Sequence, residues 1–165
     1  MNCARFADLG LLIARVGFGG YMLTHGWAKA QMLVNGEGAN FGDPIGLGPE
    51  LSLALAAFAE FVCSLLVIVG LATRLATIPI IVTMAVAAFV AHGSDPWTMG
   101  GAHELFAAGK TQYPSSKQPA LMFLVGFATL LATGPGRLSL DRVFLPKLAR
   151  RRGSAPAGSS PPAPR

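Results

Sequence analysis

The side chains of this sequence that can do chemistry lie inside long apolar stretches. Glu60 comes nine residues after Leu51, in an apolar run that extends to Ala72. A charge at the centre of a bilayer costs ~2.5–3.5 kcal/mol on insertion scales. We therefore expect Glu60 to be protonated or paired inside a helix bundle, as part of a functional site. The alternative is a structural contact with an Arg or a His that fixes the register of two helices.

A stripe of polar and small residues follows one side of the first apolar stretch. It consists of Arg15, Gly19, Met22, His25, Gly26 and Lys29. Steps of three and four residues place these side chains on one face of a helix, and its small residues let a second helix approach closely. The stripe predicts a lined pocket or an ion pathway. In the alternative, Arg15 and Lys29 reach opposite membrane interfaces, which is the favoured interpretation for Lys29, and His25 bonds a neighbouring helix.

Further polar residues gather on the connection that follows residue 91. They are His92, Asp95, His103 and Glu104. The candidate ligand or proton sites of the whole chain are Arg15, His25, Glu60 and His92. A zinc site is not expected, because the run His103-Glu104-Leu105-Phe106-Ala107 lacks the second His of an H-E-x-x-H motif. The chain has no P-loop, G-x-G-x-x-G, G-x-S-x-G or C-x-x-C-H motif, so nucleotide, serine-hydrolase and c-type haem chemistry are not expected either.

These residues are set in a chain with the composition of an integral membrane protein. Of its 165 residues 13% are charged, about half of the ~25% in soluble domains, and the mean hydropathy is +0.51. Between residues 51 and 91 only Glu60 and Arg74 are charged, so this stretch has no polar face for water. The composition argues against a soluble enzyme, a disordered chain and a disulfide scaffold. The two cysteines, Cys3 and Cys63, form no C-x-x-C motif, so a thiol relay is not expected.

The apolar stretches predict an all-α membrane protein, a bundle of four transmembrane helices. The predicted spans cover about residues 9–31, 51–72, 75–91 and 120–133. A bilayer core needs ~20 apolar residues per helix, and the last span covers only ~21 Å of a ~30 Å core. Transmembrane β-strands are not expected, because the apolar residues do not alternate with polar ones.

The distribution of Lys and Arg predicts the orientation. The N-terminal flank, the connection at Arg74 and the C-terminal tail are basic, whereas residues 32–50 contain three acids and no Lys or Arg. The positive-inside rule places both termini of this multi-pass membrane protein in the cytoplasm. We expect residues 1–145 to form the membrane domain and residues 146–165 a basic, then disordered tail. Ala28-Lys29-Ala30 is similar to a signal-peptidase site, but cleavage is not expected because Arg15 interrupts the apolar part of such a signal.

Short motifs in a fixed order make the chain similar to a known family. The first apolar stretch carries Leu12-Ile13-Ala14-Arg15 and Thr24-His25-Gly26-Trp27-Ala28-Lys29, and the second carries Ala59-Glu60 and Val69-Gly70-Leu71-Ala72-Thr73-Arg74. After the fourth comes Gly134-Pro135-Gly136-Arg137-Leu138-Ser139-Leu140-Asp141. With these motifs, residues 9–141 resemble the DoxX family of small four-helix bacterial membrane proteins. The sequence departs from many relatives at Lys117-Gln118-Pro119-Ala120, near which they carry an acid.

The last of these motifs predicts a structural element. Gly134 and Gly136 flank a proline, a combination that ends a helix and turns the chain. We expect Arg137 to anchor at the cytoplasmic headgroups, and Ser139 or Asp141 to cap a short amphipathic segment that follows. The motif then fixes the topology and takes no part in catalysis.

The resemblance implies a function linked to redox enzymes. The family includes the membrane subunit of a thiosulfate:quinone oxidoreductase and membrane partners of soluble redox enzymes. We expect a redox-associated subunit that binds quinone or a small anion, with Arg15 holding the ligand, His25 relaying a proton and Glu60 taking it up. The alternatives are a non-enzymatic anchor for soluble oxidoreductases and a small-solute or proton pathway. Expected partners are the lipid bilayer, a soluble redox enzyme and a second copy of the chain; the basic tail is expected to meet anionic lipid and not nucleic acid.

Overall fold

The structure is a computed structural model that describes residues 3–142 of the chain. Within these residues the chain is helical and contains no strand. The elements in chain order are α1 (Cys3–Val34), η1 (Gly38–Asn40), α2 (Pro49–Ala57), η2 (Phe58–Val62), α3 (Cys63–Val69), α4 (Thr73–Val86), η3 (Ala87–Ala91), α5 (Met99–Ala107) and α6 (Gln118–Thr133). The amphipathic segment expected after Asp141 and the tail expected over residues 146–165 lie outside the part that the structure describes.

Three helical segments are long and apolar enough to cross a membrane: Arg5–Val34, Pro49–Val69 and Thr73–Ala91. They correspond to the first three predicted spans, and α2, η2 and α3 run on as a single helix. This helix ends because Gly70 adopts a left-handed conformation, with φ 73° and ψ 39°. The fourth predicted span is helical too, as α6, but its 16 residues extend only ~24 Å.

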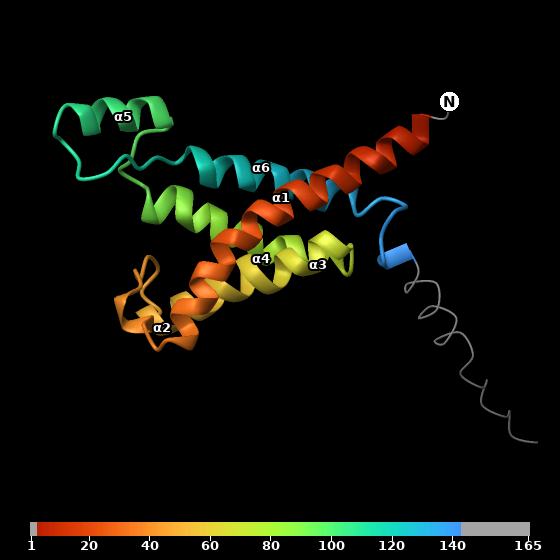
Figure 1. Cartoon of the computed structure of the whole chain (residues 1–165), viewed down its shortest axis with the longest axis horizontal. Coiled ribbons are helices and arrows are strands. Elements are labelled where there is room, and N and C mark those ends of the chain that lie inside the picture. The colour runs from red at the N-terminus through yellow and green to blue at the C-terminus, as the bar shows by residue number, and fades with distance from the viewer. Residues whose placement is uncertain (1–2, 143–165) are drawn as a thin grey trace, which may run out of the picture.

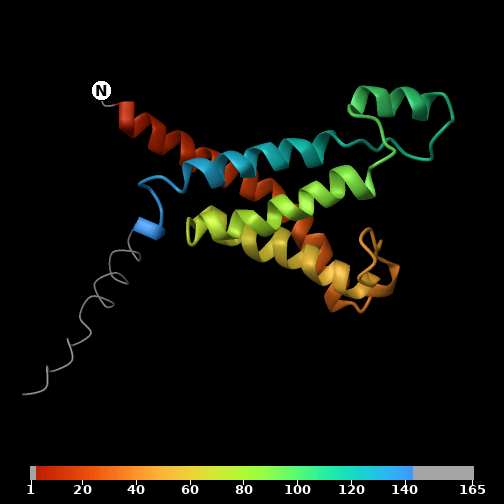
Figure 2. The same ribbon diagram turned by 180° about the vertical axis from the view of Figure 1, so that it is seen from behind.

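The long helices give the bundle two ends (Figures 1 and 2). The loop end carries residues 35–48 and the excursion that contains α5. The motif end carries the N-terminus of α1, the turn between α3 and α4, and residues 134–141. α1 crosses the other helices obliquely, whereas α6 packs along α4.

Two glycines let α1 pack closely on the second long helix, as the stripe predicts. A Cβ on Gly26 would lie 2.3 Å from the carbonyl carbon of Glu60, and a Cβ on Gly19 would lie 2.7 Å from Cγ1 of Ile68. Side-chain carbons essentially never approach other atoms so closely, so only glycine allows these contacts. The contact at Gly26 fixes which part of α1 faces η2.

The core lies between α1, α3, α4 and α6. Its largest fully buried apolar side chains are Met22, Val67, Ile80, Phe127 and Leu130. Many other large apolar side chains point outward. The residues Ile13, Leu75 and Val125, for example, are 64%, 70% and 62% exposed. Such extensive apolar surface is unusual in a water-soluble protein, whereas a helix bundle in lipid requires it.

The connection between η3 and α6 contains a helix that the sequence analysis missed. α5 begins after Thr98, whose Oγ1 accepts a hydrogen bond from the N–H of Gly101. The two ends of the excursion are tied together. The N–H of Lys117 donates to the carbonyl oxygen of Pro96 at 3.0 Å, and the ammonium of Lys117 lies 4.8 Å from the centroid of the Trp97 ring. The connection between η3 and α6 is therefore an arm that contains the helix α5, and the contacts of Lys117 with Pro96 and Trp97 hold its two ends together.

Replacing Gly26 by Ala should weaken the packing of α1. The added methyl group overlaps backbone atoms, and overpacking of this kind costs ~1–3 kcal/mol. The matched control is Gly20→Ala, because a Cβ on Gly20 meets no atom within 4 Å. Thermal unfolding in detergent micelles should show a lower Tm for Gly26→Ala and no loss for Gly20→Ala. Equal Tm values for the two variants would contradict the close contact.

Candidate functional site

The centre of the candidate site is an ion pair between α1 and η2. Nζ of Lys29 lies 2.5 Å from Oε2 of Glu60. The side chain of Glu60 is 4% exposed and that of Lys29 is 21% exposed. Removing one partner of a buried pair leaves an uncompensated charge and costs ~3–5 kcal/mol. Each residue therefore depends on the other for its position.

The geometry of the pair follows from the glycine contact. Gly26 packs against the backbone of Glu60, and Lys29 comes three residues later on the same face of α1. The prediction that Glu60 is paired inside the helix bundle is confirmed, and its partner comes from the first helix. An Arg or a His was the expected partner in a structural contact, but the glycine contact brings Lys29 to the carboxylate, while His25 lines the same cavity as Glu60. The interpretation of Lys29 as a residue of the membrane interface is wrong for the same reason.

Two π-helical segments flank the ion pair. Glu60 lies in η2, and η3 ends directly before His92. The N–H of Cys63 donates to the carbonyl oxygen of Phe58, and the N–H of His92 donates to that of Ala87 at 2.8 Å, each across five residues. π-helical turns are rare and are frequent at functional sites. Their occurrence in two neighbouring helices supports a site at this position.

The ion pair lines a cavity of about 350 Å³, the central cavity. Its lining consists of Met22, His25, Lys29, Glu60, Met84, Ala87, His92, Met99, Pro114, Ser115, Ser116, Pro119, Ala120 and Phe123. Three of the four sequence candidates, His25, Glu60 and His92, therefore surround one space. Its volume and its apolar walls with a few converging polar groups are typical of small-molecule sites. In residues 3–142 no group of three or more His, Cys, Asp or Glu side chains lies close enough to hold a metal ion.

A second cavity, the loop cavity, has a volume of about 420 Å³. It lies between the loop over residues 41–45 and the helices α2 and α4. Lys29, Glu60, Ala87 and His92 line both cavities. The ion pair thus stands between two spaces and is not sealed in a packed core.

His92 is held by a chain of hydrogen bonds. Nδ1 of His92 lies 2.8 Å from Oδ2 of Asp95, which also accepts a hydrogen bond from Oγ of Ser115 at 2.5 Å. A carboxylate only accepts, so Nδ1 carries the proton and Nε2 is the acceptor of the neutral ring. The hydrogen bonds from Ser115 and His92 hold the pKa of Asp95 below its ordinary value. The bond between Asp95 and His92 was not predicted, although their three-residue spacing was a signal for it. Ser115 was not predicted either, and the sequence carries no signal for its role.

Arg15 lies away from this site, contrary to the expectation. It precedes Lys29 by 14 residues, which is ~21 Å along a helix. Its fully buried guanidinium donates from Nη2 to the carbonyl oxygen of Leu138, while Nε and Nη1 have no partner among the residues described. A Cβ on Gly70 would overlap Nη1. Arg15 therefore connects α1 to the turn after α3 and to the C-terminal motif.

The Gly-Pro-Gly sequence turns the chain after α6, as predicted. Gly134 and Gly136 have φ values of 81° and 74°, which favour glycine. The N–H of Arg137 donates to Oδ1 of Asp8 at 2.8 Å, and Nε of Arg137 lies 3.8 Å from Oδ2. The turn thus brings the motif back to α1. The role of Arg137 at the headgroups stays a prediction.

Asp141 caps a helix, but not the one that the sequence analysis expected. Its Oδ1 accepts the N–H of Ala72 at 2.6 Å and its Oδ2 accepts the N–H of Thr73 at 3.0 Å, at the start of α4. The N–H of Asp141 donates to the carbonyl oxygen of Gly70 at 2.8 Å. The motif therefore folds back onto the turn between α3 and α4, whereas the segment that Asp141 was expected to cap lies outside the described residues. Ser139 also bonds backward, to the carbonyl oxygen of Gly136.

Replacing Asp141 by Ala should destabilise the motif end. The loss of a carboxylate cap costs ~0.5–2 kcal/mol, since two N–H groups at the start of α4 lose their acceptors. Glu104→Ala is the control, because Glu104 is an exposed residue of α5 and makes no side-chain hydrogen bond or ion pair within residues 3–142. Thermal unfolding should show a reduced Tm for Asp141→Ala alone. The cap would be refuted by an Asp141→Ala variant as stable as Glu104→Ala.

Comparison with known proteins places the ion pair inside a region that a family model matches. A family model described as DoxX matches residues 10–93. The match covers just over half of the chain and contains Lys29, Glu60 and His92, whereas α6 and the motif lie beyond it. No curated protein and no solved structure matches the chain significantly. With its long apolar helices and this match, the chain is a membrane protein that belongs to the DoxX family.

Proposed function

We propose that this protein is a redox-associated membrane subunit that binds a quinone in the central cavity. One observation carries the proposal: the cavity that holds the ion pair adjoins an apolar groove between α1 and α6. Met99, Pro119 and Phe123 line both. A quinone combines a flat ring with two carbonyl oxygens and a long apolar tail. Its site therefore needs a pocket with polar groups that opens into an apolar channel.

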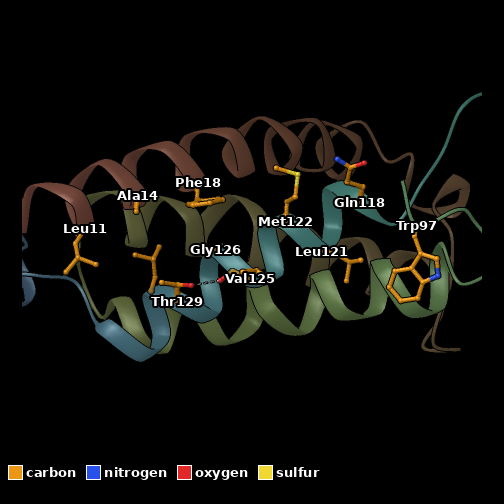
Figure 3. A pocket seen from close by; sticks show the side chains of 11 residues that line it. Leu11, Ala14, Phe18, Trp97, Gln118, Leu121, Met122, Val125, Gly126 and Thr129 are labelled. Atoms are coloured by element: carbon orange, nitrogen blue, oxygen red, sulfur yellow. Dashed lines mark hydrogen bonds between the residues drawn. The ribbon is translucent and has the colours of Figure 1, made fainter. Parts of the chain in front are cut away.

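The groove between α1 and α6 has two adjoining parts, of about 580 and 490 Å³. Both are lined by Ala14, Phe18, Gln118 and Met122. Figure 3 shows the smaller part, in which side chains of α1 and α6 meet and the lining is apolar except near Trp97, Gln118 and Thr129. A tail of isoprene units fits this lining, whereas a small inorganic anion gains nothing from it. The groove therefore favours a quinone over a small anion as the ligand.

Three polar residues of the central cavity have separate tasks in this proposal. The ammonium of Lys29 and the ring of His25 donate hydrogen bonds to the quinone carbonyl oxygens. Phe123, whose ring centroid lies 5.9 Å from that of His25, provides an apolar face for the quinone ring. Reduction of a quinone to a quinol takes up two electrons and two protons. Glu60 passes protons, and the electrons come from a soluble redox enzyme that docks on the protein.

The proposed topology has four spans in the inner membrane, with α6 as the fourth and both termini in the cytoplasm. The basic N-terminal flank and Arg74 belong to the motif end, and the acidic loop over residues 35–48 belongs to the loop end. This distribution agrees with the positive-inside rule. Lys117 precedes α6 and Thr133 ends it, so polar flanks extend its ~24 Å toward the ~30 Å bilayer core. The loop end then faces away from the cytoplasm.

Binding of a photoreactive azidoquinone to the full-length protein in lipid nanodiscs tests this function. Glu60→Gln keeps the shape of the side chain and removes its charge. We expect this variant to fold and to bind the quinone about tenfold more weakly or worse, a loss of ~1.4 kcal/mol. Glu104→Gln, on the exposed face of α5, is the matched control and should bind as the unmodified protein does.

The site of labelling and the stability of Glu60→Gln complete the test. Labelled peptides should come from α1 and α6, near His25 and Phe123. Unchanged binding by a folded Glu60→Gln variant, or labelling confined to other helices, would reject the quinone site. Glu60→Gln leaves the ammonium of Lys29 unpaired, so a lower Tm is expected as well, whereas a variant that no longer folds would show that Glu60 acts as a structural contact.

A further inference from the structure

We infer that the loop cavity is an aqueous access path through which Glu60 exchanges protons with water at the loop end. Lys29, Glu60, Ala87 and His92 line this cavity and the central cavity, so they form the partition between the two spaces. The proton passes from a hydronium ion or a buffer acid to a carboxylate oxygen of Glu60, and no electron is transferred. The path gives the carboxylate of a buried ion pair a connection to water.

The walls of the loop cavity are mostly apolar, but polar groups line it at its inner end and along its length. Its loop side is formed by residues 41–45, of which Gly42 and Ile45 are exposed. Ser52 and Thr83 line it farther in. Oγ of Ser52 donates to Asp43 and can still accept from water, whereas the hydroxyl group of Thr83 can donate and accept. Glu60 follows Ser52 by eight residues, which is ~12 Å along the helix. A proton that enters at the loop therefore travels about this distance along the helix before it meets the carboxylate of Glu60.

Asp43 holds the rim of the path in place. Its Oδ1 accepts hydrogen bonds from the N–H of Leu47 and from Oγ of Ser52, and its Oδ2 accepts from the N–H of Gly48, all at 2.9 Å. These bonds, that from Gly48 foremost, hold the pKa of Asp43 below its ordinary value. Asp43 therefore remains a carboxylate at neutral pH and fastens the loop to the start of α2.

Titratable groups meet the path only at the partition. α1 contributes Lys29, η2 contributes Glu60, and His92 follows η3 with Asp95 behind it. The lining residues of α2 and α4 and those of the loop (Phe41, Gly42, Pro44 and Ile45) carry no titratable side chain. Asp43 of the same loop is bonded to Ser52 at the rim, and of the two cavities His25 lines the central one alone. Glu60 is thus the acid that a proton arriving through the path meets in the partition, beside the imidazole of His92.

Protonation of Glu60 removes the attraction between the two side chains of the ion pair. A neutral carboxyl no longer holds the ammonium of Lys29, which can then turn toward the central cavity. This step alone rests on the proposed quinone site, where the ammonium would meet a carbonyl oxygen. The access path itself needs no ligand.

Thiol labelling tests the path in the full-length protein in lipid nanodiscs, with Cys3 and Cys63 replaced by Ala. A charged methanethiosulfonate reagent reacts with thiolates, which form in water and not in lipid. Thr83→Cys lines the path, whereas Ile78→Cys, on the same helix, faces outward and lines neither cavity. Thr83→Cys should react about tenfold faster or more, since thiolate formation needs water. Equal rates for the two variants would overturn the path.

Infrared spectroscopy after a rapid drop in pH measures proton arrival directly. The carboxyl band of Glu60, identified by its loss in Glu60→Gln, should grow about tenfold more slowly in Ala56→Leu, because that side chain fills the path. Ala85→Leu, outside both cavities, should not change the rate. An unchanged rate in folded Ala56→Leu would overturn the path, and the thiol rates decide if that variant does not fold.

Neither measurement uses a quinone, so the two proposals fail separately. Normal quinone labelling together with an unreactive Thr83→Cys would reject the path alone. A reactive Thr83→Cys together with absent quinone labelling would reject the quinone site alone.

Discussion

Burying the carboxylate of Glu60 in a helix bundle is possible because the ammonium of Lys29 lies 2.5 Å away. Apolar replacement of a buried ion pair is often neutral or stabilising by ~1–4 kcal/mol, so stability alone does not explain the pair. Its position at two cavities does, since both charges stay accessible to a ligand or to water. The glycine at position 26 is the constraint behind this arrangement, because it sets the height of Lys29 against η2.

The two ends of the bundle are built for different purposes. At the motif end, Arg15 and Asp141 tie α1, the turn before α4 and the chain after α6 together through backbone groups. At the loop end, the loop over residues 41–45 and the arm that carries α5 surround open space. A closed end holds the helices in register, so the other end can keep cavities between them without losing the fold.

The sequence was informative where a single physical rule decides the outcome. The cost of a charge in lipid predicts that Glu60 is buried and paired, and the stripe with Gly19 and Gly26 predicts the close helix contact. The partner of Glu60 was not predictable, because a long Lys side chain can reach either an interface or a neighbouring helix. The π-helical segments and the arm with α5 depend on tertiary contacts that leave no periodic pattern. Asp141 was recognised as a cap, but a capping side chain does not reveal which helix it will cap.

A double-mutant cycle on Lys29 and Glu60 tests the central claim most directly. Lys29→Met alone should lower the free energy of unfolding by ~3–5 kcal/mol, because it leaves the Glu60 charge unpaired. Lys29→Met combined with Glu60→Met should restore stability to within ~1 kcal/mol and still abolish azidoquinone labelling. Additive losses of stability in the double variant, or a stable double variant that is labelled normally, would contradict the account of the pair as the functional centre of the site.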